Sequence, residues 1–272
     1  MMTIAVVLLA GLVPAQEADE GGVRDLLNTQ FMGSRADAAT QPRSKAREAL
    51  VGVTIWRLRP SQSADAPGVR LLVHEPDRSV EYTPERVNSD TALREGDRVR
   101  MSVESAEAGY LYVVSREKYR DGSCGVPDLI FPTLRLREGN NRVRAGLVVE
   151  IPGWDDRPPY WTLRSSRADH AGEVLTLLVT PAPLEGITVG RNAVRLPPEV
   201  FDGWMRQWRG RVTAFDERKH AGLPMTEAEK AAAAYGKRLR KNDPLPQTIY
   251  RAEREPGKPV LVSTELTLLR LR

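Results

Sequence analysis

The sequence predicts a mainly β protein, specifically an antiparallel Ig-like β-sandwich with a two-helix insertion near the C-terminus. Short runs of β-branched and aromatic residues recur along the chain, and in several of them apolar and polar residues alternate. Turn-forming residues separate these runs, and no helical pattern intervenes between them before residue 197. Because 41% of the 272 residues are apolar, the chain can bury a substantial core. We therefore expect residues 48–272 to form a single β-sandwich domain.

Residues 109–132, GYLYVVSREKYRDGSCGVPDLIFP, predict the central hairpin of this sandwich. Leu111 and Val113 alternate with tyrosines, so one face of the first strand is expected to meet the core. Asp121 and Gly122 lie in a polar run and tolerate a tight reversal. Pro132 cannot donate to a β-ladder, so the second strand is expected to end there.

Further strands are expected on both sides of this hairpin, because β-branched or alternating runs end at proline or glycine. Two runs at the C-terminus, separated by Pro256 and Gly257, predict a closing hairpin. The predicted strands are residues 53–58, 69–74, 98–104, 143–151, 160–163, 174–180, 248–252 and 260–269.

Residues 197–241 depart from the β pattern and predict the helical insertion. A proline pair precedes an aromatic face at helical spacing that includes Trp204 and Trp208, and we interpret these rings as packing residues. Thr226 followed three residues later by Glu229 predicts a capping box at the start of a second helix.

The N-terminus has the pattern of an export sequence. Residues 1–16 are uncharged and carry an apolar block followed by small residues, which predicts a signal peptide, although the block lacks a preceding Lys or Arg. It is shorter than the roughly 20 residues that span a bilayer, so no transmembrane span is expected. Residues 17–47 predict a flexible lead-in with at most a short amphipathic helix at residues 23–31. The predicted location is therefore the periplasm or the outside of the cell.

Charge and cysteine content narrow the classes of function. The chain has 40 Lys and Arg against 36 Asp and Glu, a formal charge of only +4, so we expect no nucleic-acid partner. Alternating basic residues, such as Arg98 with Arg100 and Arg142 with Arg144, are typical of a solvated sheet face. Cys124 is the single cysteine and cannot form an internal disulfide.

No sequence pattern predicts a catalytic, cofactor or metal site. Cys124 has no local histidine partner, and the acidic pairs lack the spacing of a calcium loop. No glycine-rich phosphate loop opens a helix, and no paired His or Cys set predicts zinc. Residues 164–170, with Ser166 and His170, leave a hydrolase as an alternative, although triad members normally come from distant positions.

Three aromatic residues give the candidate ligand-binding site. Trp154, Tyr160 and Trp161 flank a proline pair and would form a shelf for a glycan ring or a proline-containing peptide. The alternative is that these rings cover the open end of the sandwich.

Several segments, agreeing in order, together resemble the bacterial domain of unknown function 4384 family. The resemblance runs from about residue 52 to the C-terminus. It implies an exported or envelope-associated bacterial protein, and it brings no established catalytic or ligand residues. The segments are GVTIWRLRP, EGDRVRMSVES, GYLYVVSREKYRDGSCGVPDLIFPT, NNRVRAGLVVEIP, PPYWTLRSSR, EVLTLLVTPAPL and NDPLPQTIYR.

The sequence thus favours an exported, non-enzymatic binding or interaction module of the bacterial envelope, with an envelope protein or a cell-wall glycan as the partner. A hydrolase using residues 164–170 and a structural assembly subunit are the alternatives. The sequence leaves the oligomeric state open.

Overall fold

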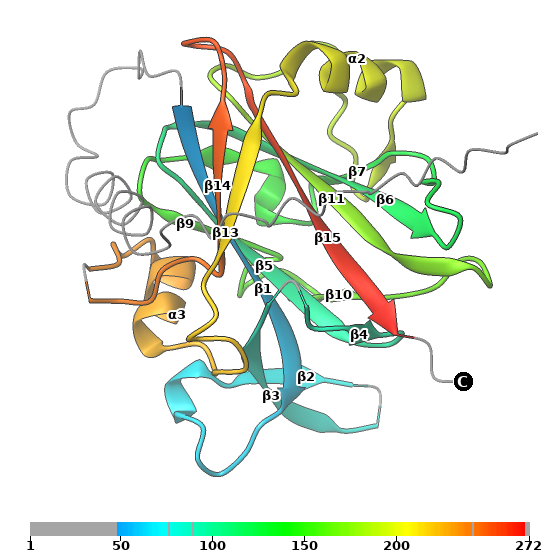
Figure 1. The fold of residues 1–272 in the computed structure, drawn as a ribbon. Helices are drawn as coiled ribbons and strands as arrows, with labels where there is room; N and C mark the ends of the chain where they lie inside the picture. Colours follow the sequence, from blue (N-terminus) through cyan, green and yellow to red (C-terminus); the bar gives the residue numbers. More distant parts are fainter. Residues whose placement is uncertain (1–47, 76, 89, 241, 270–272) are drawn as a thin grey trace, which may run out of the picture.

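The structure is a computed structural model that describes residues 48–75, 77–88, 90–240 and 242–269. Within these residues the fold is mainly β, with two sheets that pack against each other and two helices at the surface (Figure 1). The predicted signal peptide at residues 1–16 and the lead-in at residues 17–47, with its short helix, lie outside the described residues.

The larger sheet is built around the long strand β1. On one side β1 pairs with β5, and on the other side its first half pairs with β14 and its second half with β3. The order along the sheet is β10-β5-β1-β14-β13, and β2 and β9 extend it through β3 and β5. These strands are β1 (Glu48–Pro60), β2 (Leu71–His74), β3 (Ser79–Val87), β5 (Arg98–Ser105), β9 (Val148–Ile151), β10 (Trp161–Thr162), β13 (Val212–Asp216) and β14 (Thr248–Glu253).

The smaller sheet is built around the predicted central hairpin, which the structure confirms. Strand β6 pairs antiparallel with β7, and on its other side it pairs with β11. The sheet order is β12-β7-β6-β11-β15-β4, with β8 also paired to β6. Its strands are β4 (Leu93–Arg94), β6 (Gly109–Tyr119), β7 (Asp128–Phe131), β8 (Arg142–Val143), β11 (His170–Thr180), β12 (Val194–Arg195) and β15 (Val260–Leu269). Short 3-10 turns occur at η1 (Pro67–Val69) and η2 (Arg137–Gly139).

The main core lies between the two sheets. Val53 of β1 and Met101 of β5 belong to the same buried cluster as Val113 of β6, Leu177 of β11 and Val262 of β15. The predicted alternation in β6 is therefore confirmed: Leu111 and Val113 face this core, while Tyr112 packs into a second cluster on the outer face. Both faces of β6 are apolar because the second cluster, on its outer face, also contains residues of the helix at 198–208, such as Phe201.

Helix α2 (Pro198–Trp208) covers the outer face of the smaller sheet. It begins after Pro197, as the proline pair predicted. Phe201 is buried against Tyr112, while Trp204 and Trp208 stack at 6.1 Å between ring centroids and pack partly onto the same cluster. The prediction that these two rings serve packing is consistent with this position.

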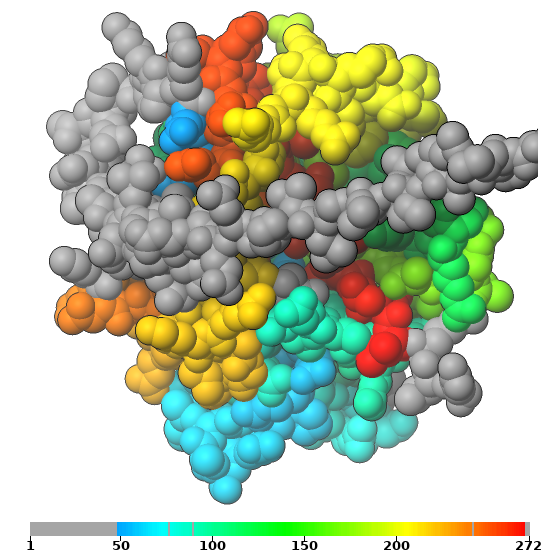
Figure 2. All heavy atoms as spheres, viewed as in Figure 1, coloured from blue at the N-terminus to red at the C-terminus, as the bar shows by residue number. Residues whose placement is uncertain are grey.

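Helix α3 (Glu227–Tyr235) lies near β9 of the larger sheet, well away from α2 (Figure 1). In Figure 2 the surface of α2 and the surface around α3 are separate regions of the visible face. The predicted capping box is present: Thr226 accepts a hydrogen bond from the Glu229 backbone, and Glu229 accepts one from the Thr226 backbone. None of the described helices has the length and apolar character that crossing a membrane requires.

The structure corrects two expectations about the strands. The C-terminal strands do not form a hairpin, because β14 pairs in the larger sheet and β15 in the smaller one. Strand β13 lies between the two helices, so the insertion at residues 197–241 also contributes an edge strand. In addition, strand β3, which contains Pro84, is absent from the predicted strands.

Candidate functional site

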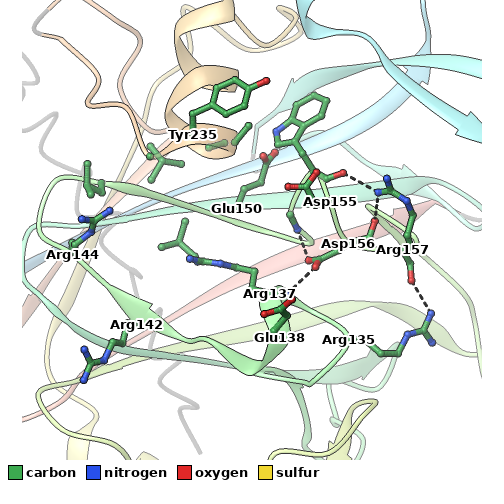
Figure 3. Close-up of a pocket in the computed structure, with 18 of the residues that line it drawn as sticks. Arg135, Arg137, Glu138, Arg142, Arg144, Glu150, Asp155, Asp156, Arg157 and Tyr235 are labelled. Carbon is green, nitrogen blue, oxygen red and sulfur yellow. Dashed lines mark hydrogen bonds between the residues drawn. The ribbon is translucent and has the colours of Figure 1, made fainter.

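A cleft of about 1150 Å³ lies between the end of α3, strand β9 and two loops (Figure 3). One loop runs from residue 134 to residue 144 and contains η2, and the other comprises residues 153–157. Figure 3 shows charged side chains from both loops gathered around this space.

Arginines dominate the lining of the cleft. All are exposed except Arg137, which is half-buried. The set comprises Arg135, Arg137, Arg142, Arg144, Arg157 and Arg191. An exposed guanidinium presents planar donors that match carboxylate and phosphate oxygens, so the set is chemically suited to an anion.

No direct ion pair among the described residues compensates the charge of these arginines. Within the part of the chain that the structure describes, no cleft arginine has a carboxylate within ion-pair distance. Arg135 instead donates to the Arg157 carbonyl at 2.9 Å, and Arg157 donates to the Trp154 carbonyl at 3.1 Å. Several arginines elsewhere form ion pairs, among them Arg59, Arg70, Arg78, Arg98, Arg211 and Arg254. The cleft thus gathers six arginines that lack a direct ion pair within the described ranges, alongside the carboxylates of Glu138, Glu150, Asp155 and Asp156.

Backbone contacts fix the two loops relative to each other. The Asp156 carboxylate accepts hydrogen bonds from the Gly153 N–H at 2.6 Å and from the Arg137 N–H at 2.9 Å. Arg137 and Glu138 have positive φ values of 50° and 55°, a conformation that is costly for residues other than glycine. The fold therefore holds this turn in a strained shape on the wall of the cleft.

The floor of the cleft carries a buried charged pair. Glu150 of β9 lies 3.0 Å from Arg100 Nη2, and neither side chain is exposed. Burial raises the pKa of Glu150 to about 7, although the positive charge of Arg100 opposes this rise. The Trp154 indole N–H is close enough to lower the pKa of Glu150, yet it is not oriented to form a hydrogen bond.

Arg100 corrects an expectation from the sequence. The alternation of Arg98 and Arg100 predicted a solvated sheet face, but Arg100 is fully buried and lies 4.3 Å above the Trp154 ring. Trp154 and the outer face of β5 exclude water there, which strand periodicity does not reveal. Arg142 and Arg144 are exposed, as expected, and both belong to the lining of the cleft. The Arg142 guanidinium also lies over the Tyr110 ring, at 5.6 Å from its centroid.

The structure separates the three predicted ligand-binding aromatics. Trp154 lines the cleft, but Arg100 and the Lys230 ammonium both lie over its ring, at 4.3 and 4.5 Å. Tyr160 packs with Trp154 onto a small apolar cluster and carries Arg98 at 4.8 Å over its ring. Trp161 packs against the main core instead. The predicted shelf of three adjacent rings is therefore divided, with Trp154 alone at the cleft.

Residues 164–170, the basis of the hydrolase alternative, make contacts outside this cleft. Ser166 donates to Glu117, and His170 Nε2 contacts the Gly172 carbonyl at 2.8 Å. Candidate ligand atoms of Glu117, His170 and Glu173 lie within 4.8 Å of one another. The sequence did not indicate this group, because its members meet only when β6 and β11 pair. Cys124 is half-buried, and its backbone forms an isolated antiparallel β-bridge with that of Lys118.

The arginine cleft was not found from the sequence. Arg135, Arg137 and Arg157 lie in loops without periodicity, and Arg191 is more than thirty residues further along the chain. Two features were available: the arginine-rich sequence LRLREGNNRVR at residues 134–144 and the lack of nearby acidic residues along most of it.

Comparison with known proteins gives one match. Residues 92–168 match the model of the family described as "Domain of unknown function (DUF4384)", and this range contains both cleft loops. The comparisons with curated proteins and with solved structures found no match. Arg191 and the end of α3 complete the cleft from outside the matched range. The resemblance inferred from the sequence is confirmed for residues 92–168, the range that the DUF4384 family model matches.

Proposed function

We propose that the protein is an exported, non-enzymatic binding module of the bacterial envelope, and that it holds an anionic ligand in the arginine cleft. The observation that carries this proposal is the set of cleft arginines that have no carboxylate partner among the described residues. Uncompensated charge in a concave site attracts and orients an oppositely charged ligand.

The shape of the site supports binding. The loop that presents Arg137 is held by hydrogen bonds to Asp156, so part of the site is formed before a ligand arrives. Preorganisation lowers the entropic cost of binding. The export pattern at residues 1–16 supports an envelope location for the ligand.

Isothermal titration of the whole protein with poly-glutamate, and with neutral dextran as the uncharged comparison, tests the proposal. We expect micromolar binding of poly-glutamate that weakens as salt is added, and no heat with dextran. The double variant Arg142→Ala/Arg144→Ala should lower the affinity about tenfold, because two lost exposed contacts of roughly 0.7 kcal/mol each amount to about 1.4 kcal/mol.

Arg211→Ala is the matched control, because Arg211 is also exposed but lies just before β13, outside the cleft, with its guanidinium 3.8 Å from the Glu253 carboxylate. Its affinity for poly-glutamate should equal that of the unmodified protein. Equal losses in Arg211→Ala and in the cleft variant would indicate nonspecific attraction and would overturn the proposal.

A further inference from the structure

We propose that the ligand of the cleft is a segment of an anionic glycan, with a sugar ring against Tyr235, its anionic groups on the arginines and its hydroxyl groups on the exposed carboxylates. This inference rests on the proposed function and specifies its ligand class.

The first argument is the exposed apolar surface at the cleft. Tyr235, at the end of α3, is 73% exposed and lies along one edge of the cleft (Figure 3). Leu134, on the facing loop, is 56% exposed. These are the two most exposed large apolar side chains among the described residues. A tyrosine ring combines an apolar face with a polar edge, which suits the mixed surface of a sugar ring.

The second argument is the order of charges along the cleft. In Figure 3 Arg142 and Arg144 lie toward one end and Arg135 and Arg157 toward the other, with Arg137 and the acidic residues between them. Two of these acids, Glu138 and Asp155, are exposed. A ligand that fits must carry anionic groups separated by an uncharged portion that donates hydrogen bonds. A glycan with charged sugar units has this composition.

The third argument separates a glycan from a nucleic acid. A nucleic-acid strand carries a negative charge on every nucleotide, and the sites that bind it combine a continuous basic groove with several stacking rings. Here the exposed carboxylates of Glu138 and Asp155 would repel closely spaced phosphates. The formal charge of the whole chain, +4, adds little general attraction.

The fourth argument is size. The cleft, at about 1150 Å³, exceeds the range of roughly 300–1,000 Å³ that is usual for a small-molecule site. It therefore suits an oligomer better than a single sugar or a free anion.

The test compares five probes on the whole protein: a short oligogalacturonate, its methyl-esterified neutral form, a phosphorylated oligomannose, poly-glutamate of matched charge and single-stranded DNA of matched charge. A phosphorylated oligomannose identifies which anionic group is preferred, and tight binding of either charged glycan supports the inference. We expect the charged glycan to bind about fivefold or more tightly than poly-glutamate or DNA, and the neutral form to bind least.

The variant Tyr235→Ala should lower the affinity for the charged glycan about fivefold while leaving the affinity for poly-glutamate unchanged. Alanine is a strong helix former, and Tyr235 is the last residue of α3, so this exchange should preserve the fold. Leu72→Ala is the matched control, since Leu72 is 52% exposed on β2, outside the cleft. It should bind every probe as the unmodified protein does.

The outcomes separate the two proposals. Equal binding of poly-glutamate and charged glycan, tighter binding of DNA, or no effect of Tyr235→Ala would overturn the glycan inference and leave the anion-binding function standing. Failure of every anionic probe to bind would overturn both.

Discussion

At the scale of single residues, the molecule uses arginine in two ways. Arg100 and Arg86 are buried and lie over tryptophan rings, at 4.3 Å from Trp154 and 4.9 Å from Trp56. Each has a carboxylate partner, Glu150 and Glu229 respectively. These buried pairs lie on the outer face of the larger sheet and link its strands to each other and to α3, whereas the cleft arginines remain available to a ligand. Burial lowers the pKa of Arg100, and Glu150 opposes that decrease.

Glu150 leads to a prediction about pH. Its pKa is about 7 in the folded protein against 4.5 in the unfolded chain, so between these values the folded state binds more protons. The resulting stabilisation is complete below pH 4.5 and is lost as the pH rises through 7. Glu150→Gln removes this titration. Relative to the unmodified protein, the variant's free energy of unfolding should therefore rise by about 1–3 kcal/mol from pH 4.5 to pH 8.

Urea unfolding at a series of pH values measures this difference. Glu138→Gln, on the exposed wall of the same cleft, is the control for loss of a carboxylate at the surface. If the Glu150→Gln and unmodified curves stay parallel across the range, Glu150 does not titrate differently in the two states and the prediction is wrong.

At the scale of elements, helix α3 connects the sandwich to the cleft. Its first turn carries Glu229, which closes the capping box and also pairs with the buried guanidinium of Arg86. Its last turn places Tyr235 at the cleft, and Gly236 ends the helix in a left-handed conformation with φ of 62°. One short helix thus depends on a buried ion pair at one end and supplies a cleft wall at the other.

The two roles of Glu229 predict unequal effects of mutation. Thr226→Ala removes only the cap and should cost about 1 kcal/mol of the free energy of unfolding. Glu229→Ala also leaves Arg86 buried without its partner and should cost about 3–5 kcal/mol. Urea denaturation measures both, and Thr226→Ser, which keeps the hydroxyl group, is the control. A cost for Glu229→Ala no larger than that for Thr226→Ala would show that the ion pair adds nothing.

Local sequence patterns predicted the helices and strands better than they predicted which strands pair with each other. The hairpin of β6 and β7 and the cap of α3 depend on residues close in sequence, and both were predicted. The predicted pairing of β14 with β15 was wrong. A turn between two strands does not determine whether the second strand pairs with the first or joins the other sheet. The cleft is formed by two loops and Arg191, which come together only in the complete fold. No local sequence pattern could therefore predict it.

At the scale of the whole molecule, the DUF4384 range does not contain its own sandwich. Strand β5 lies within residues 92–168, but it pairs with β1, where Val103 is opposite Val53. Strand β6 pairs with β11, where Val113 is opposite Leu177. Because β1 and β11 lie outside the matched range, each sheet loses a central strand when that range is isolated.

This arrangement predicts that a fragment of residues 92–168 does not fold alone. The main core needs both sheets, and the fragment would expose the apolar faces of β5 and β6 without the strands that cover them. We expect the full chain to unfold in urea with a sharp transition, and the fragment to show no cooperative transition and narrow amide proton dispersion in NMR spectra. A cooperative transition in the fragment would mean that residues 92–168 form an autonomous domain. The cleft would then have to form without Arg191 and Tyr235, so poly-glutamate binding by such a fragment would locate the essential charge within its own loops.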